Sequence, residues 1–143
     1  MNHEHHRKLE RMYAVAPINR LYDPKITISE GKTELVLPVK PEFFHAASAT
    51  HGSVYFKALD DAAFFAVSSL VEENFVVTSS FVVYLLKPIS KGTMTARGEV
   101  VHQTKSAFVA EAVLVDSDGQ QIARGSGSFV RTPIRLTPEM GYV

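Results

Sequence analysis

The sequence predicts an α+β fold in which a curved antiparallel sheet wraps around one long helix. Residues 52–70 are almost all apolar or small, apart from Lys57, Asp60 and Asp61, and such a helix is normally enclosed by other structure. Several strand-like segments follow it without a second long helix. A single helix covers only one face of a sheet, so the other face or an edge remains available for a partner subunit. We therefore expect a single domain over residues 1–143 that associates with itself.

Before the long helix, the pattern predicts a short helix and then a hairpin. His3–Tyr13 carries a narrow apolar face at helical spacing, so residues 1–24 are expected to form an amino-terminal helix and lead-in. Two short extended runs, Ile26–Ile28 and Glu34–Val39, follow on either side of turn-forming residues. Residues 41–50 are expected to form the loop that leads into the long helix.

After the long helix, the pattern changes to extended segments. Residues 75–87 are rich in Val, Phe and Leu, and apolar and polar residues alternate along residues 93–103. Asp116–Gly119 has the composition of a tight hairpin turn, which indicates that consecutive strands pair in antiparallel order. Residues 132–143 contain two prolines and are expected to form a tail. The expected strands are Phe75–Lys87, Thr93–Gln103, Ala107–Val115 and Gln121–Arg131.

The composition argues against several classes of function. Fifteen basic and fifteen acidic side chains balance, so no net field favours nucleic acid or an anionic membrane. The sequence contains no cysteine, which excludes disulfides, thiolate metal sites and a cysteine nucleophile. No apolar run approaches the roughly 20 residues of a membrane span, and the charged amino terminus does not resemble a signal peptide. We expect a cytoplasmic protein without a nucleic-acid or membrane partner.

The histidines do not form a metal-binding pattern. His3, His5 and His6 lie in an amino-terminal segment that we expect to be mobile. His45 and His51 are separated by six positions, and no third ligand follows at a recognisable spacing. We therefore expect no metal site and no bound cofactor.

The two acids in the apolar helix are the candidate catalytic groups. Lys57 precedes Asp60 by three residues and Asp61 by four, so either carboxylate can pair with it on the helix surface. Alternatively, one acid faces a pocket as a general base or nucleophile. Adjacent helical residues point about 100° apart, so only one of the two acids is expected to enter a given site.

The His51–Gly52 pair lies where the long helix begins. Amide groups in a first helical turn lack intrahelical acceptors and carry the positive end of the helix dipole. Glycine allows a ligand carbonyl to approach the backbone closely. Gly52 is therefore either a candidate oxyanion donor or a simple helix start without a ligand.

Residues 26–131 resemble the hot-dog-fold acyl-CoA thioesterases, specifically the PaaI-like branch. That branch carries the stretch Asn-x-x-Gly-x-x-His-Gly-Gly, an acid nine positions after the histidine, a hydroxyl on the next strand, and a Leu-x-Pro strand ending. In this chain His51–Gly52 matches the His-Gly pair, Asp60 matches the acid and Thr78 matches the hydroxyl. Leu86-Lys87-Pro88 matches the strand ending.

The resemblance implies a hot-dog fold and an acyl-CoA thioesterase whose site lies between the subunits of a homodimer or homotetramer. In that reading the Gly52 amide polarises the thioester carbonyl, Asp60 activates water or attacks directly, and Thr78 positions the water. The acyl-CoA is the substrate, and no other cofactor is implied. Basic side chains at the mouth of the site are expected to meet the CoA phosphates. The candidates for these contacts are Lys87, Lys91 and Lys105.

Three positions depart from the pattern of the branch. His45 stands where the branch has Asn, Ser48 replaces the first glycine, and Ser53 replaces the second glycine of the pair. The His45 ring can donate a hydrogen bond as an Asn amide does, so His45 stays in the implied catalytic set together with His51. Ser53 is assigned to the substrate-binding set.

These departures leave two other functions open. One is a non-catalytic acyl-CoA-binding or sensor module on the same fold, which would bind the thioester without releasing thiol. The other is a hot-dog dehydratase, in which His51 and Asp60 would do acid–base work.

Overall fold

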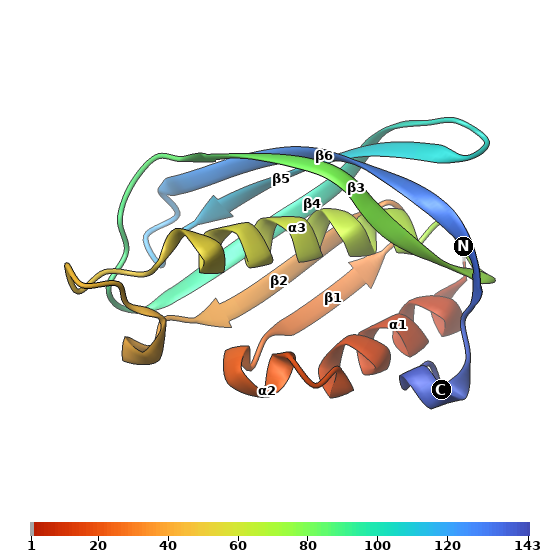
Figure 1. Ribbon diagram of the computed structural model, residues 1–143, viewed down its shortest axis with the longest axis horizontal. Helices are drawn as coiled ribbons and strands as arrows, with labels where there is room; N and C mark the ends of the chain where they lie inside the picture. The colour runs from red at the N-terminus through yellow and green to blue at the C-terminus, as the bar shows by residue number, and fades with distance from the viewer. Residues whose placement is uncertain (1) are drawn as a thin grey trace.

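The computed structural model describes residues 2–143 and contains one antiparallel sheet with a long helix at its centre (Figure 1). The helices are α1 (His3–Val15), α2 (Asn19–Tyr22) and α3 (Gly52–Ser68), and the strands are β1 (Lys25–Ser29), β2 (Lys32–Pro38), β3 (Asn74–Leu85), β4 (Thr93–Gln103), β5 (Ala107–Val115) and β6 (Gln121–Arg135). The six strands lie in the order β1-β2-β4-β5-β6-β3, and every neighbouring pair is antiparallel. The expected α+β hot-dog fold is confirmed.

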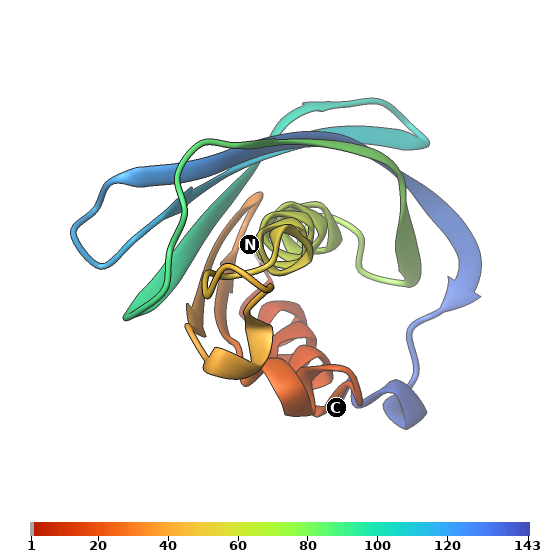
Figure 2. The ribbon, with the colours of Figure 1, turned by 60° about the vertical axis from the view of Figure 1, so that its left-hand side comes forward.

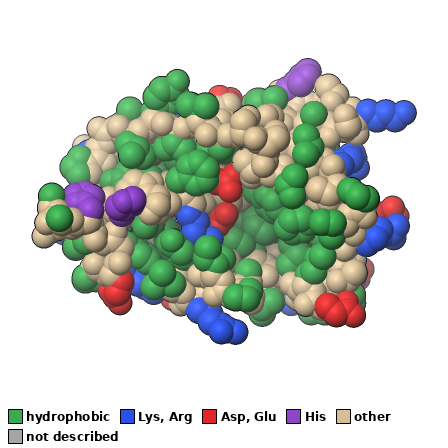
Figure 3. All heavy atoms as spheres, viewed as in Figure 1, with side chains coloured by type: hydrophobic (Ala, Val, Ile, Leu, Met, Phe, Trp, Pro, Cys, Tyr) green, Lys and Arg blue, Asp and Glu red, His purple; other side chains and the backbone are tan. Residues whose placement is uncertain are grey.

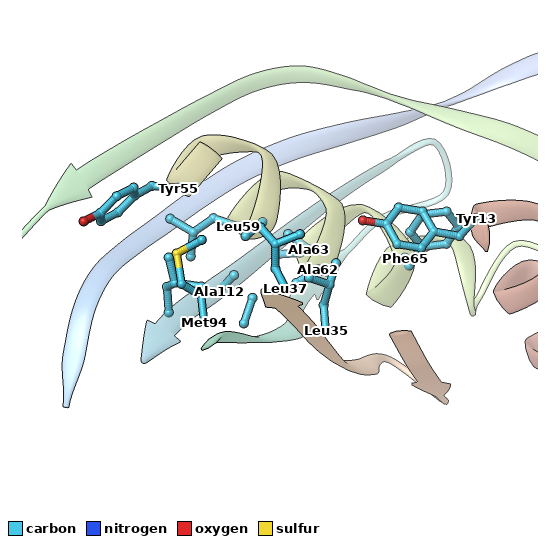
Figure 4. Close-up of a cluster of buried hydrophobic side chains, with 14 of the residues drawn as sticks. Tyr13, Leu35, Leu37, Tyr55, Leu59, Ala62, Ala63, Phe65, Met94 and Ala112 are labelled. Carbon is cyan, nitrogen blue, oxygen red and sulfur yellow. The ribbon is translucent and has the colours of Figure 1, made fainter. Parts of the chain in front are cut away.

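The sheet curves around α3, and the end-on view shows the helix enclosed by the strands on one side and by α1 and α2 on the other (Figure 2). Burial of apolar surface between helix and sheet stabilises this arrangement by roughly 25 cal/mol for each Å² removed from water. The buried side chains that meet there include Leu59, Ala62 and Ala63 of α3 and Leu35, Leu37, Met94 and Ala112 of the sheet (Figure 4).

A close contact with β4 sets the position of α3 over the sheet. A Cβ atom at Gly98 would lie 2.3 Å from the Ala62 carbonyl oxygen, so this strand position requires glycine. The Thr33 hydroxyl of β2 donates to the same carbonyl oxygen at 2.6 Å. Because Ala62 follows the two acids directly, these contacts also fix the rotation of the helix where the acids lie.

A β-bulge in β3 lies beside the middle of α3. Thr78 pairs with Phe129 and Ser80 pairs with Ser128, so Ser79 is the extra residue on the β3 strand. Before the bulge, the even-numbered residues Val76 and Thr78 turn inward. After it, the odd-numbered residues Phe81 and Val83 are the partly buried ones. The bulge therefore reverses the alternation directly after Thr78 and aims this hydroxyl at the helix.

The amino-terminal segment corrects one expectation. His5 and His6 are 2% and 1% exposed, so they belong to the folded interior and not to a mobile terminus. His5 Nε2 donates to the Ser68 carbonyl oxygen at 2.8 Å, and His5 Nδ1 lies 2.6 Å from the Tyr142 hydroxyl. Burial lowers the pKa of His6. The expectation failed because both partners of His5 lie more than 60 residues away in the sequence.

The carboxyl-terminal segment also folds against α1. Strand β6 continues to Arg135, four residues beyond the expected strand end at Arg131. The Arg11 guanidinium donates to the Val143 carbonyl oxygen at 2.5 Å, and Gly141 packs against Met12. The final residues thus close the opening between α1 and the sheet. Within residues 2–143, no helix is both long and apolar enough to cross a membrane.

Candidate active site

Asp60 lies in the middle of α3 on the side that faces β3. The Thr78 hydroxyl donates to Asp60 Oδ1 at 2.9 Å. Burial raises the pKa of Asp60 from 3.8 to about 6, although the Thr78 hydrogen bond opposes the rise. The charge of Asp61 raises this pKa further and the charge of Lys57 lowers it. A carboxylate with a pKa near 6 can accept a proton efficiently at neutral pH.

Asp61 lies on the other side of the helix, in a different electrostatic environment. Its Oδ2 accepts hydrogen bonds from the Tyr13 hydroxyl at 2.6 Å and from the Lys57 ammonium group at 2.7 Å. The Lys57 ammonium group also lies over the rings of Tyr13 and Tyr22, 5.6 and 4.9 Å from their centroids. Lys57 therefore pairs with Asp61 and not with Asp60, and a cation and a phenol hold the Asp61 carboxylate.

A pocket of about 280 Å³ opens at these acids between α3, β3 and the segment that joins α1 to α2. In the space-filling view, acidic side chains reach the surface near the middle of this face, beside a hollow bordered by hydrophobic side chains (Figure 3). Asp60, Asp61 and Thr78 line the pocket together with several apolar and aromatic side chains. A carboxylate, a hydroxyl and an apolar wall are thus presented to one small space.

Two further residues of this pocket were missed from the sequence. Tyr13 bonds Asp61, and Asn19 donates from Nδ2 to the Tyr13 carbonyl oxygen at 2.7 Å. Asn19 is only 4% exposed, and no donor within residues 2–143 reaches its Oδ1 atom. The apolar face of the first helix predicted burial of Tyr13, but its position alone does not show that the phenol reaches an acid 48 residues away.

The amino-terminal end of α3 presents a second group of polar atoms. His51 is the N-cap residue, and its Nδ1 accepts from the Ser53 amide at 3.0 Å and lies 2.8 Å from the Ser53 hydroxyl. The His51 carbonyl oxygen accepts from the Val54 amide. Within residues 2–143, the Gly52 N–H group donates to no acceptor, so this amide of the first turn is available to a ligand.

Gly52 and Asp60 are not brought together within one chain. Eight residues separate them on the same helix, and a rise of 1.5 Å per residue places them about 12 Å apart. Gly52 lies instead at the far end of β3, where its added Cβ would be 3.0 Å from Leu85 Cδ1. A donor at Gly52 and a base at Asp60 of the same chain cannot act on one carbonyl group.

The loop before α3 presents His45 and Ser48 to solvent. The loop is closed by a β-bridge between Phe44 and Thr50, and His45 Nδ1 accepts from the Ala47 amide at 3.0 Å. The neutral His45 ring therefore carries its proton on Nε2, which is a hydrogen-bond donor. Ser48 has φ +63°, the left-handed conformation that favours glycine, which explains why a glycine suits this position. Within residues 2–143 no three candidate metal ligands are grouped.

The three lysines assigned to the CoA phosphates do not gather around Asp60. Lys87 lies at the end of β3, 3.8 Å from Asp116 Oδ2 and within hydrogen-bonding reach of Gln120. Lys91 is exposed just before β4, whereas Lys105 is exposed just after it. The eleven residues of β4 place the two ends of that strand about 35 Å apart. Lys105 and the other two lysines therefore belong to opposite ends of the sheet.

Comparison with known proteins identifies relatives for most of the chain. Residues 48–123 match the family model of the thioesterase superfamily. SSO2140 of Saccharolobus solfataricus, which is named as a proposed esterase, is 27% identical over 112 residues, covering 77% of this chain and 80% of that protein. A thioesterase family protein from Silicibacter pomeroyi has a TM-score of 0.81 and 27% identity over 89% of this chain and 97% of its own. The Escherichia coli PaaI protein from the phenylacetic acid degradation operon has a TM-score of 0.86 and 23% identity over 94% of this chain and 98% of its own.

Proposed function

Because the chain belongs to the thioesterase superfamily, we propose that it is an acyl-CoA thioesterase with Asp60 as its catalytic carboxylate. The observation that carries this proposal is the environment of Asp60: a partly buried carboxyl group with a pKa near 6, hydrogen-bonded to Thr78 and lining a pocket. Perturbed carboxyl groups in pockets are characteristic of catalytic acids and bases. The reaction converts an acyl-CoA and water into a carboxylic acid and free CoA.

In the proposed reaction, ionised Asp60 takes a proton from a water molecule as the water oxygen bonds to the thioester carbon. The carbonyl π electrons move onto the oxygen and form an oxyanion, which collapses as the carbon–sulfur bond breaks. The CoA thiolate leaves and takes up the proton that Asp60 accepted. Thr78 holds the Asp60 carboxylate through Oδ1, which leaves Oδ2 to bind the water.

The oxyanion donor is proposed to come from a second copy of the chain. The Gly52 amide has no other acceptor within residues 2–143, but it lies about 12 Å along the helix from Asp60 of its own chain. Strand β3 forms one edge of the sheet, with Val82, Tyr84 and Leu85 more than half exposed. An antiparallel β3–β3 contact about a two-fold axis would run the two α3 helices in opposite directions, so the start of one would lie beside the middle of the other.

The remaining residues are assigned to the mouth of this shared site. His45 and His51 lie near the Gly52 end of α3, and each neutral ring accepts a backbone hydrogen bond at Nδ1 and donates from Nε2. Ser53 supports the His51 ring. Lys87 and Lys91 lie at this end of the sheet and are the proposed CoA phosphate contacts, whereas Lys105 would have to act from the partner's side.

Thiol release from a panel of acyl-CoAs tests the catalytic assignment. We expect Asp60→Asn to lower kcat by about 100- to 10,000-fold, the usual contribution of a general base, while Thr78 keeps an oxygen acceptor. Glu30→Gln, in the exposed β1–β2 turn at the opposite edge of the sheet from β3, removes one negative charge away from the site and serves as the control. Unchanged turnover in Asp60→Asn would exclude the mechanism, and tight acyl-CoA binding without thiol release by the parent protein would indicate a binding module instead.

A matched pair of substitutions tests the Gly52 amide. Gly52→Pro removes the N–H group at the first helical position, where proline is well tolerated, and His51 already has the extended backbone that proline requires before it. Gly52→Ala adds a Cβ beside Leu85 but keeps the N–H group. We expect kcat of Gly52→Pro to be about 100-fold lower than kcat of Gly52→Ala. Equal losses in both variants would show that only the added carbon matters.

Mixing the two inactive variants tests the shared site. In a two-fold dimer of Asp60→Asn with Gly52→Pro, one site combines both changes and the other site has neither. Random exchange of subunits should therefore restore about a quarter of the parent activity. No recovery, in a mixture shown to contain mixed dimers, would rule out a site that combines Gly52 of one chain with Asp60 of the other.

A further inference from the structure

The largest apolar cavity described in this chain adjoins the Asp60 pocket. It has a volume of about 690 Å³ and lies between the end of α1, the second half of α3, the start of β3 and the carboxyl-terminal segment. The two spaces share Tyr13, Ala16, Phe64 and Phe65 as lining residues. Phe64 follows Asp60 by four residues, so both side chains lie on the same face of the helix, one turn apart. The cavity therefore continues directly from the proposed reaction centre.

The wall of the cavity is aromatic and aliphatic. The Phe64 ring lies 5.0 Å from the Phe65 ring and 5.6 Å from the Phe75 ring, and the Phe65 ring lies 4.9 Å from the Tyr13 ring. Ile134 of β6 completes the wall and is 50% exposed. Such a surface gains free energy when an apolar group removes it from water.

The carboxyl-terminal side of the cavity is held in place by several contacts. A Cβ at Gly141 would lie 2.4 Å from Val15 Cγ2, and the Tyr142 hydroxyl is bonded to buried His5. The Leu136 amide donates to the Glu73 carbonyl oxygen at 2.9 Å. The segment that sequence reasoning treated as a tail thus forms a fixed wall of this space.

The charges around the cavity decide which end of an acyl-CoA it suits. Within residues 2–143, the cavity lining contains no Lys or Arg, and its one ionisable acid is Glu139. Phosphate groups require cationic or N–H donors, so the CoA moiety does not fit here. An apolar acyl group does fit, whereas an acyl group that ends in a carboxylate would be desolvated beside Glu139 without a cation to pair with.

We propose that this cavity is the acyl-binding pocket and that the substrates carry an extended apolar acyl group, as opposed to an acetyl or a dicarboxylic acyl group. This inference rests on the proposed function, because it requires the thioester carbonyl to lie at Asp60. It predicts that kcat/KM rises about fourfold for each methylene group added from butanoyl to octanoyl-CoA, in line with the free energy of burying one methylene. It also predicts that succinyl-CoA is a far poorer substrate than butanoyl-CoA, which has the same number of acyl carbons.

A pair of variants at Ile134 tests the location of the pocket. Ile134→Asp places a carboxylate in the apolar wall, and Ile134→Leu keeps the wall apolar. We expect Ile134→Asp to lower the octanoyl-to-acetyl ratio of kcat/KM at least tenfold and Ile134→Leu to change it less than threefold. Val101→Asp, at an equally exposed position on β4 away from this cavity, should leave the ratio unchanged.

The outcomes separate the two proposals. If no acyl-CoA releases thiol, the proposed function fails. Suppose instead that acyl-CoAs are hydrolysed but kcat/KM does not depend on acyl length, or that Ile134→Asp lowers kcat/KM equally for every substrate. The thioesterase function then stands and the assignment of the acyl pocket is wrong. A chain-length preference that Ile134→Asp removes supports both.

Discussion

The two sides of α3 give opposite environments to neighbouring carboxylates. On the side of α1, Asp61 accepts hydrogen bonds from Lys57 and Tyr13 at 2.7 and 2.6 Å. On the side of β3, Asp60 has one neutral partner, the Thr78 hydroxyl, and burial raises its pKa to about 6. The two residues have identical side chains and are adjacent in sequence, so the difference comes entirely from what each side of the helix meets.

This difference separates a structural acid from a chemical one. A carboxylate paired with a cation and a phenol holds elements together, here α1 to α3. A carboxylate that is partly buried without a cation of its own retains affinity for a proton, which a general base requires. The pairing of Lys57 with Asp61 therefore leaves Asp60 free for the proposed reaction, and each prediction below changes one side of this contrast.

The largest effect is expected from a change on the α1 side of α3, where Asp61 is paired with Lys57. Lys57→Met removes the cation and leaves the Asp61 charge, whose side chain is 18% exposed, with only the Tyr13 hydroxyl. We expect the free energy of unfolding to fall by about 2 to 3 kcal/mol, somewhat less than for a fully buried pair. The double variant Lys57→Met/Asp61→Asn removes both charges and should recover most of the loss in urea unfolding. A double variant as unstable as the single one would show that Lys57 acts through packing over the tyrosine rings.

The pH dependence of catalysis tests the β3 side of α3, where Asp60 has no cation of its own. Asp60 must be ionised to accept a proton, so kcat/KM should rise about tenfold per pH unit below about 6 and reach a plateau above it. Because the Asp61 charge raises this pKa, Asp61→Asn should move the rise to lower pH, and Lys57→Met should move it to higher pH. A rate independent of pH between 4.5 and 7 would contradict the assignment of Asp60 as the base.

The stability of Asp60→Asn sharpens the contrast further. The folded-state pKa of Asp60 is about 6 and its ordinary value is 3.8, so between these values the folded state holds more protons than the unfolded state. Stability is therefore lost as pH rises through this window, and ionised Asp60 destabilises the fold above pH 6. Allowing for partial exposure, we expect Asp60→Asn to gain about 1 to 2 kcal/mol at pH 7.5 and nothing below pH 4. An equal gain at both pH values would rule out ionisation as the cause.

The smallest effect is expected from Tyr13→Phe. This change removes the hydroxyl that donates to Asp61 and keeps the ring against Phe65. One hydrogen bond to a charged acceptor that retains its other partner should be worth about 1 kcal/mol of unfolding free energy. Thermal unfolding of Tyr13→Phe in the Asp61→Asn background should show a smaller loss. An undiminished loss there would mean that the hydroxyl stabilises the fold without Asp61.

Much of the fold follows from local pattern. The alternation along Thr93–Gln103 predicted β4, and β5 was also predicted with the bounds that the structure has. The apolar run after Gly52 predicted α3. The end of β6 and the burial of His5 were not predictable, because they depend on contacts with residues far away in the chain. His5 is buried because Ser68 and Tyr142 satisfy its two ring nitrogens, and nothing near position 5 indicates either partner.

The sequence by itself determined that this chain has one apolar helix carrying two acids behind a His-Gly start, whereas the hydroxyl of Thr78 was singled out only by the resemblance to the hot-dog thioesterases. It could not decide which acid Lys57 pairs with, since spacings of three and four residues both allow contact. Tertiary structure decided it: α1 brings the Tyr13 hydroxyl to Asp61, and the bulge at Ser79 aims Thr78 at Asp60. Helical geometry fixes the angle between adjacent side chains, but only the elements packed on each side determine their charge environment.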